Sequence, residues 1–281
     1  MIISINGVTK VYPRKTALDN ITAEFTSGLY GVLGKNGAGK STLFKIMTGL
    51  ITPTSGTIEF DGKVGLGNRV GYLPQEFGFP GFLEVEDIIQ QIAVMRGIDK
   101  KEIPQIIDSI LNQVNLQPQR KSKFESLSGG MKRRVGIAQA LVGEPDVLIL
   151  DEPTAGVDPV ERVAIRSIVN DYAQNHIVLL STHIISDVEL ICENLLILDD
   201  GQLKYQGSVN ELISAAQEHV STRTFDAVES FDQYLRENRV YAFRRVGGHI
   251  EATVPSSSGA EHIPAENVSL EDAYMWVIDR D

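Results

Sequence analysis

The chain has 281 residues, which is long enough for a sizeable hydrophobic core and for two unequal domains. Hydrophobic residues make up 42% and charged residues 22%, as in ordinary globular proteins, and a formal net charge of −11 argues against a protein that coats nucleic acid. No stretch reaches the roughly 20 apolar residues of a membrane-spanning helix, and no secretory leader is recognisable, so we expect a cytoplasmic protein.

The first 60 residues have the alternating pattern of strands separated by turns, which predicts an antiparallel β-subdomain. Within them an apolar run, LYGVLG, meets a glycine-rich turn, and KSTLFKIMTGL follows with apolar residues at helical spacing. TSGTIEFDGK resembles a strand that ends in the turn pair Asp61 and Gly62.

The middle of the chain becomes helical from about residue 77 to residue 143, in EVEDIIQQIAVMRGI, IPQIIDSILNQVNL and GGMKRRVGIAQALVG. Strand patterns return in DVLILDEP, HIVLLSTH and NLLILDDGQLKYQG, with the helical stretch PVERVAIRSIVNDYAQ between the first two. Strands that alternate with helices predict an α/β fold with a mainly parallel sheet, here with a helical insertion at about residues 77–143.

The last part of the chain differs in charge and pattern. Residues 209–281 carry 13 acidic and 6 basic side chains, whereas the preceding 208 residues carry 24 and 20. Gly247 and Gly248 lie between alternating segments and indicate a hairpin. Two stretches have a helical pattern, VESFDQYLRENR and SLEDAYMWVID, the second with Ser269 as its N-cap. We expect a loop at PSSSGAEHIPAEN. We therefore expect a domain at 1–208 and a small α+β extension at 209–281.

One thiol is present, and we expect it to be structural. Cys192 lies in ELICENLLIL, where a small buried hydrophobe is a simpler interpretation than a catalytic thiol, and it has no second cysteine with which to form an intramolecular disulfide.

The stretch GKNGAGKST matches the pattern G-x-x-x-x-G-K-S and lies between a predicted buried strand and a predicted helix. Backbone N–H groups at the start of a helix suit the binding of phosphates, whereas a glycine-rich structural turn is the alternative. In this pattern Lys40 reaches the β- and γ-phosphates and the Ser41 hydroxyl can ligate Mg²⁺. The residues of this predicted phosphate loop are Gly34, Lys35, Asn36, Gly37, Ala38, Gly39, Lys40, Ser41 and Thr42.

Two adjacent carboxylates, Asp151 and Glu152, end the apolar strand of DVLILDEP. Such a pair is often only a solvated strand end. Combined with the phosphate loop, it predicts that Asp151 holds Mg²⁺, commonly through water, and that Glu152 polarises an attacking water.

Three further residues follow predicted strands. Gln75 could ligate Mg²⁺ or contact the attacking water, His183 could hydrogen-bond a γ-phosphate, and Tyr12 could stack on a purine ring. Taken singly, each has a simpler interpretation, as a surface glutamine, a structural histidine and a packed tyrosine.

The segment ESLSGGMKRR places two glycines between a serine and three cations. The basic run could be a solvated helix face, a nucleic-acid patch or part of an anion-binding helix. On the last of these interpretations, Ser128 and the N–H groups of Gly129 and Gly130 would form an anion site reinforced by the helix dipole.

In this order, Tyr12, GKNGAGKST, Gln75, LSGGM, VLILDEP, AGVD and His183 resemble the ATP-binding subunit of an ATP-binding-cassette (ABC) transporter over about residues 1–208. The resemblance implies a P-loop NTPase core that hydrolyses ATP with Mg²⁺. It further implies that Tyr12 stacks on adenine, that Gln75 links the nucleotide to the transport machinery, and that His183 senses the γ-phosphate. Asp158 would lie in the loop through which two subunits communicate.

In that family LSGG faces the nucleotide of the opposite subunit, so the resemblance implies a head-to-tail dimer, for which two copies of this chain are chemically sufficient. It also implies separately encoded transmembrane permease subunits, docked on the insertion around EFGFPGFLEVEDII, and a location at the cytoplasmic face of the membrane. The C-terminal SLED helix resembles exporter-type subunits; a soluble superfamily ATPase of translation or DNA repair is the alternative. Met131 stands where many members have glutamine, which leaves the rate of hydrolysis open.

Overall fold

The fold is built around a six-stranded sheet, in a computed structural model that describes residues 1–256, 263–264 and 268–280. Its strand order is β10-β9-β3-β8-β7-β6, in which β10 is antiparallel to β9 and the other neighbours are parallel. The strands are β3 (Gly28–Leu33), β6 (Val70–Leu73), β7 (Val147–Asp151), β8 (Ile177–Thr182), β9 (Asn194–Asp199) and β10 (Gln202–Ser208). The predicted mainly parallel sheet is confirmed.

A second, antiparallel sheet has the order β2-β1-β4-β5 and is the predicted N-terminal β-subdomain. Its strands are β1 (Ile3–Tyr12), β2 (Lys15–Phe25), β4 (Ser55–Phe60) and β5 (Lys63–Val64). Asp61 and Gly62 join β4 to β5 with φ of 47° and 74°, as the two central residues of a type I′ turn require, so the expected turn is confirmed.

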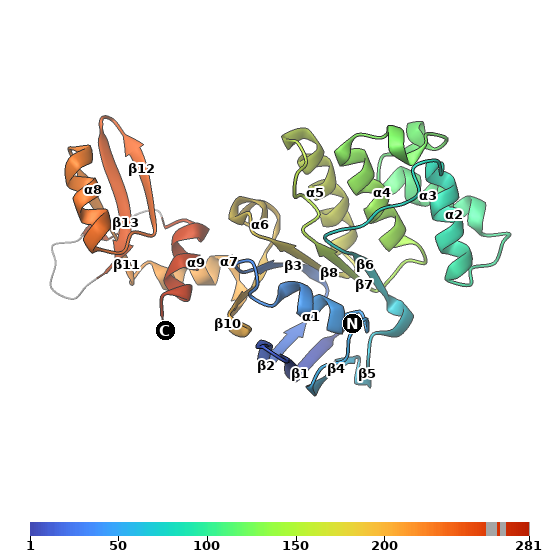
Figure 1. Cartoon of the computed structure of the whole chain (residues 1–281), viewed down its shortest axis with the longest axis horizontal. Helices are drawn as coiled ribbons and strands as arrows, with labels where there is room; N and C mark the ends of the chain where they lie inside the picture. The colour runs from blue at the N-terminus through green and yellow to red at the C-terminus, as the bar shows by residue number, and fades with distance from the viewer. Residues whose placement is uncertain (257–262, 265–267, 281) are drawn as a thin grey trace.

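Helix α1 (Lys40–Met47) lies between the two sheets, and further helices cover the opposite face of the six-stranded sheet (Figure 1). These are α4 (Gly129–Leu141), α5 (Pro159–Ala173) and α6 (Ile185–Ile191), whereas α2 (Val85–Met95) and α3 (Ile103–Gln113) pack against α4 beyond the sheet. Short 3₁₀ turns lie at Gly67–Arg69, Gln117–Gln119 and Phe124–Ser126. The first helical stretch expected in the insertion, EVEDIIQQIAVMRGI, is confirmed as α2, with Glu84 as its N-cap. Pro74, Gly78, Pro80 and Gly81 precede it and break helices, so α2 begins at Val85.

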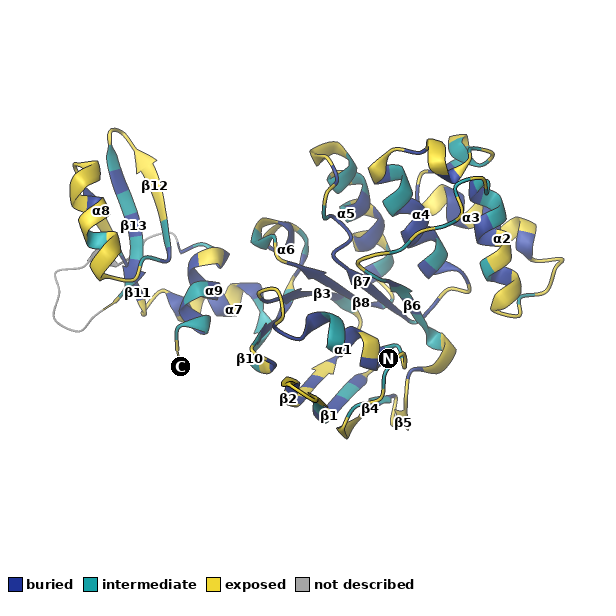
Figure 2. Cartoon of the chain, viewed as in Figure 1, coloured by how far each residue is buried: buried dark blue, intermediate teal, exposed yellow. Residues whose placement is uncertain are grey.

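The core is divided by the six-stranded sheet into two layers. In β8, Ile177 and Leu179 pack toward α1 and the β-subdomain, whereas Val178 and Leu180 pack toward α4 and α5. Figure 2 shows the central strands buried on both faces. Apolar runs such as VLILD and IVLLS therefore do not alternate with polar residues, because neither face of the sheet meets water.

The C-terminal region forms a third sheet, of order β12-β13-β11-β14, at the end of the molecule away from α2 (Figure 1). Its elements are α7 (Val209–Ala216), β11 (Val220–Phe225), α8 (Val228–Glu237), β12 (Ala242–Val246), β13 (His249–Pro255), β14 (Ile263–Pro264) and α9 (Leu270–Ile278).

The sequence-based expectations for this region are mostly confirmed. Gly247 and Gly248 turn the β12–β13 hairpin, and Ser269 caps α9 by accepting a hydrogen bond from Asp272 N. The expected loop at 255–267 is wrong at Ile263–Pro264, which pairs with β11; residues 257–262 and 265–267 lie outside the described residues. Within the described ranges no helix is long and apolar enough to span a bilayer.

Candidate functional site

The predicted phosphate loop connects β3 to the first turn of α1, with glycines where a side chain would not fit. A Cβ on Gly34 would lie 2.4 Å from the backbone oxygen of Leu198, and one on Gly39, whose φ is 113°, would lie 2.7 Å from Ala17 O. The loop can therefore pass close to neighbouring backbone only with glycine at these positions.

Lys40, the first residue of α1, folds back over this loop. Its side chain is buried, and Nζ donates hydrogen bonds to Gly34 O at 2.5 Å and to Lys35 O at 3.2 Å. Burial lowers the pKa of Lys40, while the charges of Glu152 and Asp151 act to raise it. A buried ammonium whose hydrogen bonds go only to neutral carbonyls is suited to gain a charged acceptor, so the loop fits an anion such as a phosphate.

The carboxylates expected at the end of β7 are both buried. Asp151 Oδ1 accepts a hydrogen bond from Ser181 Oγ at 2.5 Å. Glu152 has φ of 52°, a conformation that few residues other than glycine adopt, and its N–H donates to Ser181 O at 3.1 Å. Residues held in this sparsely populated conformation often lie at functional sites.

Ser181 is a residue that the sequence analysis missed. It is fully buried on β8, directly opposite Asp151 in the parallel register, and its hydroxyl also accepts from Glu152 N at 3.0 Å. A serine that ends the apolar run IVLLST was the available signal, because a buried hydroxyl needs a partner.

His183 directly follows β8 and lies beside Glu152, which directly follows β7. Its Nδ1 is 3.0 Å from Glu152 Oε1, and 54% of the histidine side chain is exposed against 8% for the glutamate. The structure therefore brings together Lys40, the two carboxylates and His183, with the imidazole at the open side of the group.

Tyr12 and Gln75 lie on other elements, and no hydrogen bond or ion pair among the described residues joins either of them to this group. Tyr12 is the last residue of β1, and its register partner Lys15 donates to Gly37 O at 2.8 Å, which places the β1–β2 turn beside the phosphate loop. Gln75 is exposed, two residues after β6, and its backbone oxygen accepts from Arg133 at 3.0 Å.

Ser128 is the N-cap of α4, and its Oγ accepts from Met131 N at 3.2 Å. Gly129 is exposed with open space at its Cβ position, whereas a Cβ on Gly130 would meet Glu161 Cγ at 2.3 Å. Met131 packs its side chain against the hydrophobic core. The N-terminal end of α4 is thus open to solvent. Within the described residues no hydrogen bond or ion pair joins Ser128 to the phosphate loop of the same chain.

Asp158 also caps a helix, since its Oδ1 accepts from Glu161 N at the start of α5 at 3.0 Å. Glu161 in turn forms an ion pair with Arg134 of α4, at 3.0 Å between Oε2 and Nε. The two helix N-termini that carry Ser128 and Asp158 are therefore held together by one ion pair and by the contact of Glu161 with Gly130.

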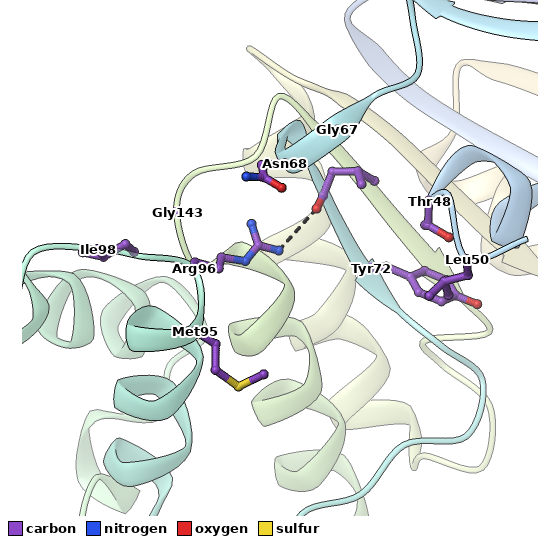
Figure 3. A pocket seen from close by; sticks show the side chains of 10 residues that line it. Thr48, Leu50, Gly67, Asn68, Tyr72, Met95, Arg96, Ile98 and Gly143 are labelled. Carbon is purple, nitrogen blue, oxygen red and sulfur yellow. Dashed lines mark hydrogen bonds between the residues drawn. The ribbon is translucent and has the colours of Figure 1, made fainter.

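A cavity of about 540 Å³ opens where α1, β6 and the end of α2 meet (Figure 3). Leu50 and Met95 expose 63% and 85% of their surface at its rim, and Arg96 donates to Val70 O at 3.3 Å across it. The lining consists of Thr48, Leu50, Gly67, Asn68, Val70, Tyr72, Met95, Arg96, Ile98 and Gly143. This surface offers exposed apolar side chains around the exposed guanidinium of Arg96.

The oxygen donors near the phosphate loop are of the kind that Mg²⁺ prefers. The Ser41 hydroxyl, on the first turn of α1, and the Asp151 carboxylate are hard oxygen ligands, and Mg²⁺ usually needs only one or two carboxylates in addition to the phosphates of a substrate. Within the described ranges no cluster of three or more His, Cys, Asp or Glu side chains is arranged to hold a metal ion by itself. The donor set fits Mg²⁺ that arrives together with a phosphate ligand.

Comparisons with known proteins agree with one another. A family model described as ABC transporter matches residues 18–155. The uncharacterized ABC transporter ATP-binding protein YxlF of Bacillus subtilis is 32% identical over 238 residues, 84% of this chain and 80% of that protein. The Nod factor export ATP-binding protein I of Ralstonia nicotianae is 33% identical over 224 residues, 76% of this chain and 69% of that protein. A solved structure of an ATP-binding subunit of an ABC transporter has a TM-score of 0.67 and 27% identity, covering 76% of this chain and 93% of that one. The chain therefore belongs to the ABC transporter family, as an ATP-binding subunit.

Proposed function

We propose that the chain powers export through separately encoded transmembrane subunits. The similarity to a Nod factor export ATP-binding protein supports the direction of transport, and the matches to transporter subunits do not favour the alternative of a translation or DNA-repair ATPase. The single observation that carries the hydrolytic role is the buried group of Lys40, Asp151 and Glu152 at the phosphate loop.

ATP is the substrate of this site. We assign phosphate binding to the backbone of residues 34–42 and to Lys40, whose ammonium would exchange the carbonyls of Gly34 and Lys35 for phosphate oxygens. Tyr12 would stack on the adenine from the β1–β2 turn, which Lys15 holds beside the loop.

Ser41, Gln75 and Asp151 would hold Mg²⁺, the last commonly through water. The ion would neutralise part of the phosphate charge. Ser181 orients Asp151 for this role, because its hydroxyl donates to the oxygen Oδ1 and leaves Oδ2 available.

Glu152 would polarise the attacking water, and His183 would hold that carboxylate while facing the γ-phosphate. The 3.0 Å contact between His183 Nδ1 and Glu152 Oε1 supports this pairing, since it fixes one carboxylate oxygen and leaves the other to accept from water. Burial of Glu152 keeps bulk solvent from competing for the same oxygen.

The active unit would be a head-to-tail homodimer. Ser128, Gly129 and Gly130 begin a helix whose end is open, so its N–H groups and dipole are available to the phosphates bound by a second copy. Asp158 would communicate between the two subunits whether nucleotide is bound at that site, because Glu161 connects α5, the helix that Asp158 caps, to α4. ATP between the two copies would favour the closed dimer, so hydrolysis reopens it.

Transmembrane subunits would dock at the cavity between α1, β6 and α2, next to the insertion at 77–143, and hold the chain at the cytoplasmic face of the membrane. The exposed side chains of Leu50 and Met95 support this site, since apolar surface of this kind gains from being covered (Figure 3). We also propose the division into an ATPase domain at 1–208 and an extension at 209–281.

The docking proposal can be tested by membrane fractionation of cells that express full-length variants. Met95→Asp should move the chain from the membrane fraction to the supernatant, because it places a charge on the docking surface. Val64→Asp is the matched control, since Val64 is 76% exposed on β5, and it should stay with the membranes. Retention of Met95→Asp with the membranes would refute the docking site.

A further inference from the structure

The three cations that follow LSGGM have different neighbours. Lys132 Nζ lies 5.7 Å from the centre of the Phe124 ring, and Arg134 pairs with Glu161. Arg133 lies over the Phe77 ring, 5.5 Å from its centre, and donates from Nη1 to the backbone oxygen of Gln75 at 3.0 Å. Arg133 is thus the cation that connects α4 to the segment containing Gln75.

The loop between β6 and α2 is also hydrogen-bonded, at its other end, to the segment that precedes α4. Phe124 N donates to Leu83 O at 2.8 Å, and Glu125 N donates to Gly81 O at 3.0 Å, just before the Ser128 cap. Between the two ends, Phe77 packs directly on α4, because a Cβ on Gly136 would lie 2.5 Å from its ring. The hydrogen bond from Arg133 to the backbone oxygen of Gln75 is the contact with α4 that lies nearest to Gln75.

Arg133 also lies in the electrostatic field of the catalytic carboxylates. Burial lowers the pKa of its guanidinium, and the negative charges of Glu152 and Asp151 oppose that effect. Within the described part of the chain Arg133 forms no ion pair, and its hydrogen bond goes to a main-chain carbonyl. An arginine needed only for solubility would keep its head in water instead of placing it over a ring and a backbone oxygen.

We infer that Arg133 is a positioning residue that holds Gln75 in place for ATP hydrolysis and makes the Gln75 loop move together with the helix that begins at Ser128. This inference rests on the role proposed for Gln75. When the N-terminus of α4 contacts nucleotide bound to a second copy, Arg133 would then transmit the movement of α4 to Gln75 of the same chain. A guanidinium suits this function because it can donate to the carbonyl while its flat face lies on Phe77.

The test is a double-mutant cycle on the full-length chain with Arg133→Met and Gln75→Ala, measured as steady-state ATP hydrolysis with Mg²⁺. Methionine keeps an unbranched stem over Phe77 and removes the donor. We expect Arg133→Met to lower kcat about tenfold with KM for ATP changed less than about threefold, as for a misplaced catalytic group. The double variant should be no slower than Gln75→Ala alone, because both changes act on one group.

Lys132→Met is the matched control on the adjacent cation and should keep kcat within about twofold, as expected of a surface side chain. Cleavage by chymotrypsin after Phe77 and Phe79 gives a second readout that does not depend on turnover, because it requires this segment to leave its packing on α4. It should be faster in Arg133→Met and unchanged in Lys132→Met.

The outcomes separate this inference from the proposed function. If Gln75→Ala leaves kcat unchanged, the role proposed for Gln75 fails. If Gln75→Ala is slow but the two single effects multiply in the double variant, or if cleavage after Phe77 and Phe79 is equally fast in Arg133→Met and the wild type, the role inferred for Arg133 is overturned.

Discussion

Replacing Ser181 by alanine removes the hydroxyl that contacts both Asp151 and Glu152. In the wild type that hydroxyl donates to Asp151 Oδ1 at 2.5 Å and accepts from Glu152 N at 3.0 Å. Glu152 N keeps a second acceptor, Ser181 O at 3.1 Å, so the loss falls mainly on Asp151. Hydrogen bonds to charged groups contribute about 1.5–3 kcal/mol.

If that free energy is used to orient Asp151 in the transition state, kcat should fall roughly 10- to 150-fold. ATP binding in the absence of turnover should change little, because Lys40 and the phosphate loop are untouched. The assay is steady-state hydrolysis together with a direct titration of ATP, on protein whose folding is checked by thermal unfolding.

Ser221→Ala is the matched control, since Ser221 is also a buried strand serine, with a hydroxyl 2.7 Å from Ser256 Oγ in the C-terminal sheet. It should hydrolyse ATP at the wild-type rate. Unchanged kcat in Ser181→Ala, or an equal loss in Ser221→Ala, would refute the reasoning that Ser181 acts through Asp151.

Three other changes test separate parts of the site. Lys40→Ala should weaken ATP binding itself by about tenfold or more, since it removes a charge-assisted contact to the phosphates; a titration that shows wild-type affinity would contradict this. Ser128→Arg and Lys40→Ala should each inactivate the homodimer. A mixed dimer of the two variants should recover about half of the wild-type activity, because one of its two sites combines the intact phosphate loop of one copy with the intact Ser128 of the other. If no activity is recovered, Ser128 acts at the phosphate loop of its own chain. Cys192 should react with a thiol reagent at pH 8 only after denaturation, because burial raises its pKa to about 12 and leaves little thiolate below that pH.

The order of strands and helices was predictable because hydrophobic periodicity and turn residues act locally. The Asp61–Gly62 turn, the Gly247–Gly248 hairpin and the Ser269 cap each follow from residues within four positions of one another. The first helix of the insertion was predictable in the same way, because EVEDIIQQIAVMRGI contains the whole of α2, which begins at Val85.

Contacts between segments far apart in the sequence could not be predicted from local patterns. The hydroxyl of Ser181 meets Asp151 only because β7 and β8 are neighbours in register, thirty positions apart in the chain. Gly130 was interpreted as part of an anion site, but its lack of a side chain is also required by Glu161 packing against it. Local patterns identify candidate residues, whereas the sheet register determines which of them meet.

The most direct test of the central claim, that ATP is hydrolysed between two copies with Glu152 polarising the water, is size-exclusion chromatography of Glu152→Gln with ATP and Mg²⁺. Glutamine keeps the shape and hydrogen-bonding reach of Glu152 and removes its basicity. The account predicts a stable dimer that retains about one ATP per chain, with turnover nearly abolished. A monomer that hydrolyses ATP at the wild-type rate would contradict it.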